Sequence, residues 1–182
     1  MAGFKLDPEV EFYFATEIVD RDDCGNYIYK NTRGKWKTLS LHPLGNGYYE
    51  VKAVTKQYGR IRTTLHRLIF IRAYRKMIPK GWVIHHLDCN HENNHYTNLI
   101  AVPDKIHVAY HATYAAAKAN PLHHIQKTTK GYKVHFDLYG FDVFKKTVHK
   151  TLEEAIKDRN NRMRKLDKIF ASYALTIPEY YA

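Results

Sequence analysis

The chain has 182 residues, enough for one large domain or two compact ones to bury a core without cysteine staples. Its two cysteines, Cys24 and Cys89, form no C-x-x-C pair, which excludes disulfide scaffolds and cysteine-based zinc motifs. The net charge of +11 divides into −2 for residues 1–50, +8 for 51–120 and +5 for 121–182, which favours a polyanionic partner, although a basic surface with no partner would carry the same charge.

The same composition argues against a membrane or exported protein. No apolar run approaches the roughly 18 residues of a membrane span, and Met1 to Asp7 lack the basic-then-apolar pattern of a signal peptide. We therefore expect a cytoplasmic protein, or one in the cytoplasm of a host cell if a phage encodes it.

Residues 1–26 form an acidic N-terminal segment. Within residues 7–23, aromatic and aliphatic residues are interleaved with seven acids and a single base; the acids are Asp7, Glu9, Glu11, Glu17, Asp20, Asp22 and Asp23. We expect a short peripheral segment with an exposed edge.

Residues 27–80 predict a β-rich extension followed by a helix. The stretch from Tyr27 to Thr64 is rich in Tyr, Val, Thr and Ile, with turn signals at 32–34, 44–47 and 58–59, which indicates short antiparallel strands. Arg60 and Arg62 alternate with Ile61, so both arginines lie on one face of the strand and are candidate DNA contacts. Residues 65–74 change to helical spacing and predict a core-packing helix ending before Pro79. Its expected inward residues are Leu65, Leu68, Ile69 and Ala73.

Residues 81–120 predict a strand, a loop, a second strand and a helix. Residues 81–84 form the first strand and 85–98 a polar loop, after which 99–102 form the second strand. Pro103 and Asp104 suit a helix's first turn, and strong helix formers continue to Ala119.

Residues 126–173 predict a small β-β-α module. It begins with a connection at 126–130 that is rich in Lys and Thr. One strand is indicated by alternating Tyr132, Val134, Phe136 and Leu138, followed by a turn at Tyr139-Gly140 and a second strand to about Val148. The capping box of residues 151–154 opens a helix to about Tyr173. Its expected inward residues are Leu152, Ala155, Ile156, Met163, Leu166 and Phe170.

The chemical signal lies between residues 85 and 111. Residues 85–99 read H-H-L-D-C-N-H-E-N-N-H-Y-T-N-L, and His107 and His111 follow. This pattern resembles the HNH endonucleases, whose His, Asn and His are matched by His86, Asn98 and His107. Upstream, the letters L-H-R-L-I at 65–69 resemble the helix that precedes the motif in phage homing-type members.

Phosphodiester hydrolysis requires a general base and a cation. The resemblance gives His86 the role of base, and an imidazole titrates near neutral pH. We nominate His85, His107 and His111 as metal ligands. His107 and His111 lie one helical turn apart on one face, and adjacent residues of a strand point in opposite directions, so His85 can hold metal while His86 faces water.

The asparagines of this segment are expected to support the site and to take no direct part in the chemistry. By resemblance, Asn98 is the middle HNH residue, which fixes the loop and orients the base. Asn90, Asn93 and Asn94, together with Asp88, are expected to stabilise turns, because short polar side chains bond nearby backbone groups.

Two positions depart from the homing-type pattern. His85 stands where those members usually have Asp, and Cys89 where they usually have Gly. The doubled histidine and the later H-x-x-x-H resemble instead the colicin nucleases of the bacterial toxin branch. Three imidazoles suit Zn²⁺, Ni²⁺, Co²⁺ or Mn²⁺ better than Mg²⁺, so the identity of the single expected divalent ion stays open among these five.

Residues 91–95 also match H-E-x-x-H, the zinc protease helix. That chemistry needs an amphipathic helix, and the asparagine-rich segment lacks helix propensity and an apolar stripe, so we interpret it as a solvated loop tip. The remaining histidines have no ligand spacing and are expected to be structural or on the surface: His66, His123, His124, His135 and His149.

Residues 128–170 resemble the Apetala-type DNA-binding domain that is appended to phage HNH nucleases. The resemblance implies that the sheet face enters the major groove, which admits a β-ribbon, with Lys133, His135 and Lys145 as candidate contacts. A structural cap is the alternative. The helix bases Arg159, Arg162, Arg164 and Lys165 are expected to form a solvated face.

We therefore expect an α+β fold with a ββα-metal core, a β-rich N-terminal extension and a C-terminal β-β-α module. The resemblance implies a metal-dependent DNA nuclease that leaves 5′-phosphate and 3′-hydroxyl ends, and modules on both sides of the site favour a site-specific homing-type enzyme on double-stranded DNA. A monomer would nick, and a homodimer could cut both strands. The alternatives are a nonspecific toxin-type nuclease and a catalytically silent DNA-binding protein.

Overall fold

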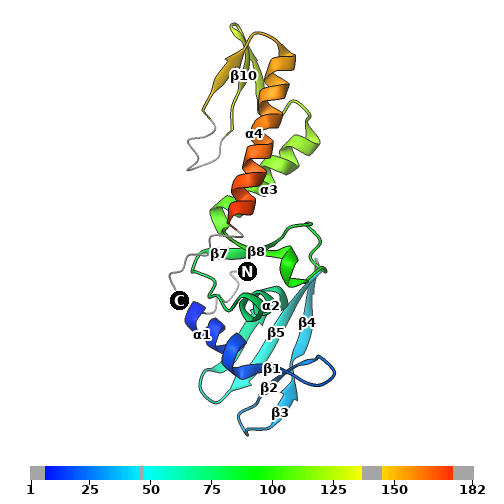
Figure 1. Cartoon of the computed structure of the whole chain (residues 1–182), viewed down its shortest axis with the longest axis vertical. Helices are drawn as coiled ribbons and strands as arrows, with labels where there is room; N and C mark the ends of the chain where they lie inside the picture. Colours follow the sequence, from blue (N-terminus) through cyan, green and yellow to red (C-terminus); the bar gives the residue numbers. More distant parts are fainter. Residues whose placement is uncertain (1–6, 46, 137–144, 174–182) are drawn as a thin grey trace. The chain divides into compact units, whose positions relative to one another are not determined.

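The computed structural model describes residues 7–45, 47–136 and 145–173 (Figure 1). The chain divides into two compact units, the first reaching Ala101 and the second beginning at Val102. Both combine helices with small antiparallel sheets, so the α+β class is confirmed.

The acidic N-terminal segment belongs to the core of the first unit. It forms α1 (Pro8–Tyr13), a π-helical turn η1 (Phe14–Ile18) and β1 (Val19–Arg21). Phe14 is completely buried, and the carboxylate of Glu11, 2% exposed, accepts a hydrogen bond from Nε of Arg67 at 2.8 Å. The prediction of a peripheral segment is therefore wrong, because the aromatic residues between the acids supply core surface and a half-buried arginine neutralises the innermost acid.

Two three-stranded antiparallel sheets follow, as the turn signals predicted. One is ordered β1-β2-β3 and contains β2 (Tyr27–Lys30) and β3 (Trp36–Thr38); the other is ordered β4-β5-β6 and contains β4 (Ser40–Gly45), β5 (Tyr48–Thr55) and β6 (Gly59–Thr64). In the second sheet Ala53 pairs with Ile61, and both are buried. Arg60 and Arg62 lie on the opposite, exposed face, because side chains alternate along a strand.

The helix α2 (Leu65–Tyr74) has the predicted limits and packs against β5 (Figure 1). It ends at Arg75, which is left-handed with φ 50°. Leu68 is buried as predicted, but Ala73 is exposed, and Phe70 is buried in its place. The helix buries a wider face than the apolar spacing suggested, because this face also includes His66.

The predicted strand, loop, strand and helix of residues 81–120 are confirmed. They are β7 (Trp82–His86), the loop with the short 3-10 helix η2 (Tyr96–Asn98), β8 (Leu99–Pro103) and α3 (Asp104–Ala119). β7 pairs with β8 and extends two residues beyond the predicted strand, so it includes both histidines of the H-H pair.

The second unit contains a sheet of order β11-β10-β9, with β9 (Ile125–Thr128), β10 (Gly131–Val134) and β11 (Thr147–His149), packed against α4 (Leu152–Ser172). The predicted connection at 126–130 is therefore wrong in part, because Lys127 pairs with Tyr132 as part of a third strand. The capping box is confirmed: Thr151 Oγ1 accepts from the Glu154 backbone at 3.2 Å. The predicted turn at Tyr139-Gly140 and the predicted strand residue Leu138 lie outside the described residues.

Two of the arginines expected on a solvated face of α4 are buried. Arg159 is 9% exposed and Arg162 is 6% exposed, whereas Arg164 and Lys165 are exposed as predicted. Arg162 donates to both carboxylate oxygens of Asp158 and to the Lys145 carbonyl. The prediction failed because this carboxylate and carbonyl satisfy a guanidinium that would otherwise need water.

Across the described ranges, none of the helices combines the length and the apolar character that crossing a membrane requires.

Candidate active site

The strand β7 places two adjacent histidines in different surroundings. Val83 and Ile84 favour the extended backbone that continues through His85 and His86. His85 is 4% exposed and His86 1% exposed. Because successive side chains of a strand point to opposite faces, the two rings meet different neighbours. The expectation that His86 faces water is wrong for this structure, because Asn94, Tyr48 and His66 surround its ring.

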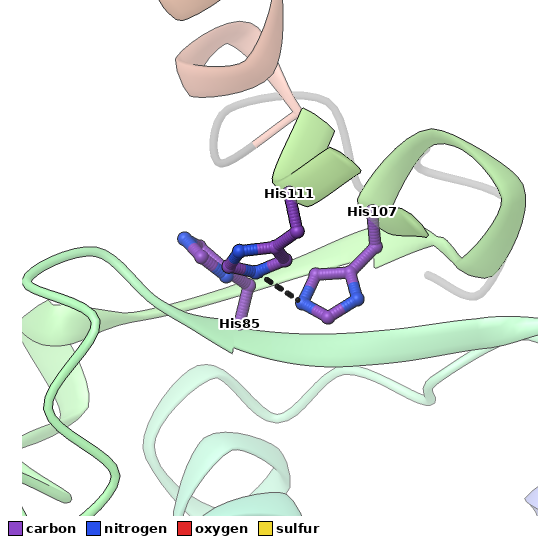
Figure 2. A group of neighbouring side chains, drawn as sticks. All are labelled: His85, His107 and His111. Atoms are coloured by element: carbon purple, nitrogen blue, oxygen red, sulfur yellow. Dashed lines mark hydrogen bonds between the residues drawn. The ribbon is translucent and has the colours of Figure 1, made fainter. Parts of the chain in front are cut away.

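His85 groups with His107 and His111 (Figure 2). One ligand nitrogen from each lies within 4.8 Å of the other two. On α3, Nε2 of His107 and Nε2 of His111 are 3.1 Å apart, and the two rings meet edge to face with centroids 4.5 Å apart. Nitrogens bound about 2.05 Å from one tetrahedral ion lie about 3.3 Å apart, close to the separation of the two α3 nitrogens, so the three imidazoles could hold one divalent metal ion.

His86 contacts a separate group of side chains in the first unit. Its Nε2 lies 3.0 Å from the side-chain oxygen of Asn94, and its ring lies 6.0 Å from Tyr48 and 5.4 Å from His66 between centroids. With Asn94 accepting the Nε2 proton, the lone pair is on Nδ1, which has no hydrogen-bond partner among the described residues. This hydrogen bond therefore favours the tautomer whose lone pair is on a buried, unpartnered Nδ1.

Burial lowers the pKa of His86, and the nearby His91 lowers it further, whereas the Asn94 hydrogen bond and the charge of Asp88 act in the opposite direction. The neutral ring that a general base requires is consequently the form present at neutral pH. His66, behind it, has its pKa lowered to about 3 by burial and by neighbouring positive charges. It is a neutral, buried partner, which agrees with the expected structural role.

The loop after β7 is held by hydrogen bonds between Asp88 and Asn98. Asn98 Nδ2 donates to Asp88 Oδ1 at 2.9 Å, and Asn98 Oδ1 accepts from the Asp88 backbone at 3.1 Å. Asp88 Oδ2 accepts from Asn93 at 2.7 Å, and these bonds, with the backbone N–H of Asn90, lower the Asp88 pKa to about 2. The loop therefore closes on an ionised carboxylate, and Asn98 lies at its centre.

Cys89 adopts a left-handed backbone within this loop, with φ 57°. That region favours glycine, because a Cβ crowds the following carbonyl. The position at which the sequence departs from the Gly of homing-type members is thus one where the backbone geometry suits Gly.

The turn between β4 and β5 supports the loop from the other side. The Tyr48 ring stacks on the His91 ring at 4.4 Å, and a Cβ on Gly47 would lie 3.1 Å from that of His91. Residues 91–95 form turns without a helix, so the geometry of a zinc protease helix is missing from this segment.

The five candidate DNA contacts lie on sheets or at their edges. Arg60 and Arg62 are exposed on β6. Lys133 is a central residue of β10, His135 follows that strand and hydrogen-bonds through its backbone with His124, and exposed Lys145 precedes β11.

Sequence reasoning missed three contacts of His86: Asn94, Tyr48 and His91. Asn94 was identified only as a turn former, and nothing in an asparagine-rich loop shows which amide faces the base. Tyr48 was hidden among 15 tyrosines. Its glycine-rich turn was the one available signal that this segment approaches another backbone closely.

Residues 64–109 match a family model described as HNH endonuclease. No curated protein and no solved structure matches the chain. The matched residues include α2, the His85–His86 pair, Asn98 and His107, which are the elements described above. The chain therefore carries an HNH endonuclease domain at residues 64–109, the domain of a class of nucleases that hydrolyse phosphodiester bonds.

Proposed function

We propose that the chain is a metal-dependent endonuclease that hydrolyses phosphodiester bonds of double-stranded DNA and leaves 5′-phosphate and 3′-hydroxyl ends. One observation carries this proposal: the adjacent residues His85 and His86 are divided between a three-histidine cluster and an asparagine-bonded base. A hydrolase that uses one cation and one general base needs this division.

The residues have distinct roles in the reaction. His86 accepts the proton of the attacking water at Nδ1, the water oxygen bonds to phosphorus, and the bond from phosphorus to the 3′-oxygen breaks, with the departing oxygen taking a proton from solvent. His85, His107 and His111 would hold one divalent cation, which supplies charge neutralisation at the phosphate and at the departing oxygen. Asn98 keeps the loop closed through Asp88 and thereby positions the strand end that carries both histidines.

The donor set favours one group of metals. Three neutral imidazoles suit Zn²⁺, Ni²⁺, Co²⁺ or Mn²⁺, whereas Mg²⁺ prefers oxygen ligands and keeps much of its water. Replacing His107 with Ala is expected to abolish metal retention and cleavage together. Unchanged metal content in purified His107→Ala would contradict the assignment.

We further propose site-specific, homing-type action. The β9–β11 sheet would read the duplex through Lys133, His135 and Lys145, and Arg60 and Arg62 would contact it from the first unit. A single HNH centre cuts one strand per visit, so a monomer nicks, and a homodimer is required to break both strands.

The test is cleavage of supercoiled plasmid with each divalent metal in turn. Wild type should nick, and His86→Ala should lose nicking because no other described side chain replaces its Nδ1. His95→Ala is the matched control: the exposed side chain of this histidine in the H-E-x-x-H stretch hydrogen-bonds only to Thr97 among the described residues, so the variant should retain activity.

The outcomes separate the alternatives. Discrete end-labelled fragments support a homing-type enzyme, and a smear supports a nonspecific toxin-type nuclease. If wild type binds DNA but cuts with none of the metals, the chain is a catalytically silent DNA-binding protein.

A further inference from the structure

The first unit contains a hollow lined by basic side chains, on the sheets that precede the HNH domain. A hollow of about 290 Å³ lies on the exposed face of β4–β6 beside β2 and β3. Its lining, which we call the cationic hollow, consists of Tyr29, Lys37, Ser40, His42, Lys52, Ala53, Val54, Arg60 and Arg62. Small-molecule pockets are mainly apolar, whereas four lysines and arginines and one histidine line this one.

The strand register fixes where these cations lie. Ser40 pairs with Lys52 and Lys52 pairs with Arg62, so the three side chains form one row across β4, β5 and β6. Arg60 pairs with Val54 in the next row on the same face. Rows two residues apart on a strand are separated by about 6.7 Å and neighbouring strands by about 4.8 Å. The basic side chains therefore form a two-dimensional grid on the sheet.

One carboxylate lies beside this grid. Glu50 bonds to Lys52 at 2.7 Å, and its other oxygen lies 3.9 Å from Nε of Arg62. In the described part of the chain, neither Lys37 nor Arg60 forms an ion pair. The face therefore keeps an excess of positive charge, and Glu50 orients two of its members.

We propose that the cationic hollow is a sequence-independent anchor for the phosphate backbone of duplex DNA. This inference rests on the proposed function and extends it from Arg60 and Arg62 to Lys37, His42 and Lys52. A DNA strand carries one phosphate per about 3.4 Å of helix axis, so more than one phosphate faces a grid of these dimensions. Contacts of this kind position a protein on the duplex and carry no base information.

The test is duplex affinity of the full, metal-free chain in chelator, measured by fluorescence anisotropy at several salt concentrations on two unrelated sequences. Arg60→Ala/Arg62→Ala should weaken binding at least about tenfold on both and reduce the slope of log affinity against log salt by about 1.8. Arg60→Lys/Arg62→Lys should restore most of the slope, because a lysine still neutralises a phosphate. Lys80→Ala, an exposed lysine outside the hollow, should match wild type.

Glu50→Gln provides a change of opposite sign, since it frees Lys52 and Arg62 and should strengthen binding. The proposal is overturned if the double variant behaves like Lys80→Ala, or if its loss is confined to one of the two sequences. Circular dichroism of each variant checks the fold. The affinity measurement contains no metal and does not depend on cleavage. Failure of the wild type to cut in the plasmid assay with metal would therefore contradict the proposed function but would leave the affinity result interpretable.

Discussion

At the scale of single residues, the orientation of His86 depends on one amide. Asn94 Oδ1 accepts the Nε2 proton of a buried ring whose Nδ1 is otherwise unpartnered in the described structure. Asn94→Ala removes this acceptor, and a misplaced base costs about 10²-fold in rate. We expect kcat to fall by about that factor with little change in KM, measured from the rate at which supercoiled plasmid is nicked.

Metal content provides the control for this variant, because Asn94 does not belong to the His85–His107–His111 cluster. Asn94→Ala should bind as much metal as wild type. Full activity in the variant would show that the tautomer of His86 is set by something else.

Cys89 allows a test of backbone geometry against side-chain chemistry. Its φ of 57° suits Gly and strains a β-branched residue. Cys89→Gly should therefore retain the cleavage rate and resist thiol-modifying reagents, whereas Cys89→Val should unfold at lower temperature and cut more slowly. Loss of activity in Cys89→Gly would assign a chemical role to the thiol.

The sequence predicted the residue types of this site better than their contacts. The H-x-x-x-H spacing on a helix and the adjacent histidines on a strand predicted which three rings meet, since both follow from fixed local periodicities. The Asn94 contact was not predictable, because it depends on how the loop closes around Asp88. Tyr48 and His91 stack although they lie far apart in the sequence, so no local pattern predicts their contact.

At the scale of elements, α4 is attached to β11 by a partly buried polar network. Asp158 accepts from Arg162, from Thr147 at 2.7 Å and from His149 at 2.8 Å. Burial raises the pKa of Asp158, but these hydrogen bonds outweigh it and hold the pKa well below its usual range. The carboxylate therefore stabilises the second unit most when it is ionised.

This network predicts an acid-dependent loss of stability. A folded pKa below the unfolded value of about 3.9 gives stability that is complete above that pH and is lost as the pH falls through the folded pKa. Asp158→Asn should lower the free energy of unfolding by about 2 kcal/mol at neutral pH, since the bonds are charged but partly exposed to solvent. Its unfolding free energy should then vary less with pH below 4 than that of wild type.

Denaturant titrations at neutral and acid pH measure both effects, and Glu153→Gln, an exposed acid on the same helix, is the matched control. Equal stability of Asp158→Asn and wild type at pH 7 would contradict the role of the network.

Local sequence signals located most elements, and tertiary contacts explain the exceptions. The ends of α2 and the capping box of α4 were predicted because they depend on neighbouring residues alone. β9 was missed because Gln126 and Lys127 are polar and its strand structure comes from pairing with β10. The N-terminal segment was misplaced because the partner of Glu11, Arg67, lies on α2, far along the sequence.

At the scale of the whole molecule, metal binding and folding are expected to be linked. The three histidines of the proposed metal site come from β7 and α3 and meet only in the folded chain. An ion that binds the folded state and not the unfolded one stabilises it by about 2.7 kcal/mol at a hundred times its Kd. We expect Zn²⁺ or Ni²⁺ to raise the midpoint of thermal unfolding of wild type, and chelator to reverse the rise.

His107→Ala should lose this response, and His95→Ala, which lies outside the cluster, should keep it. An equal rise in His107→Ala would place the stabilising ion elsewhere. Because the measurement needs no DNA, it tests the metal site independently of whether the chain cuts.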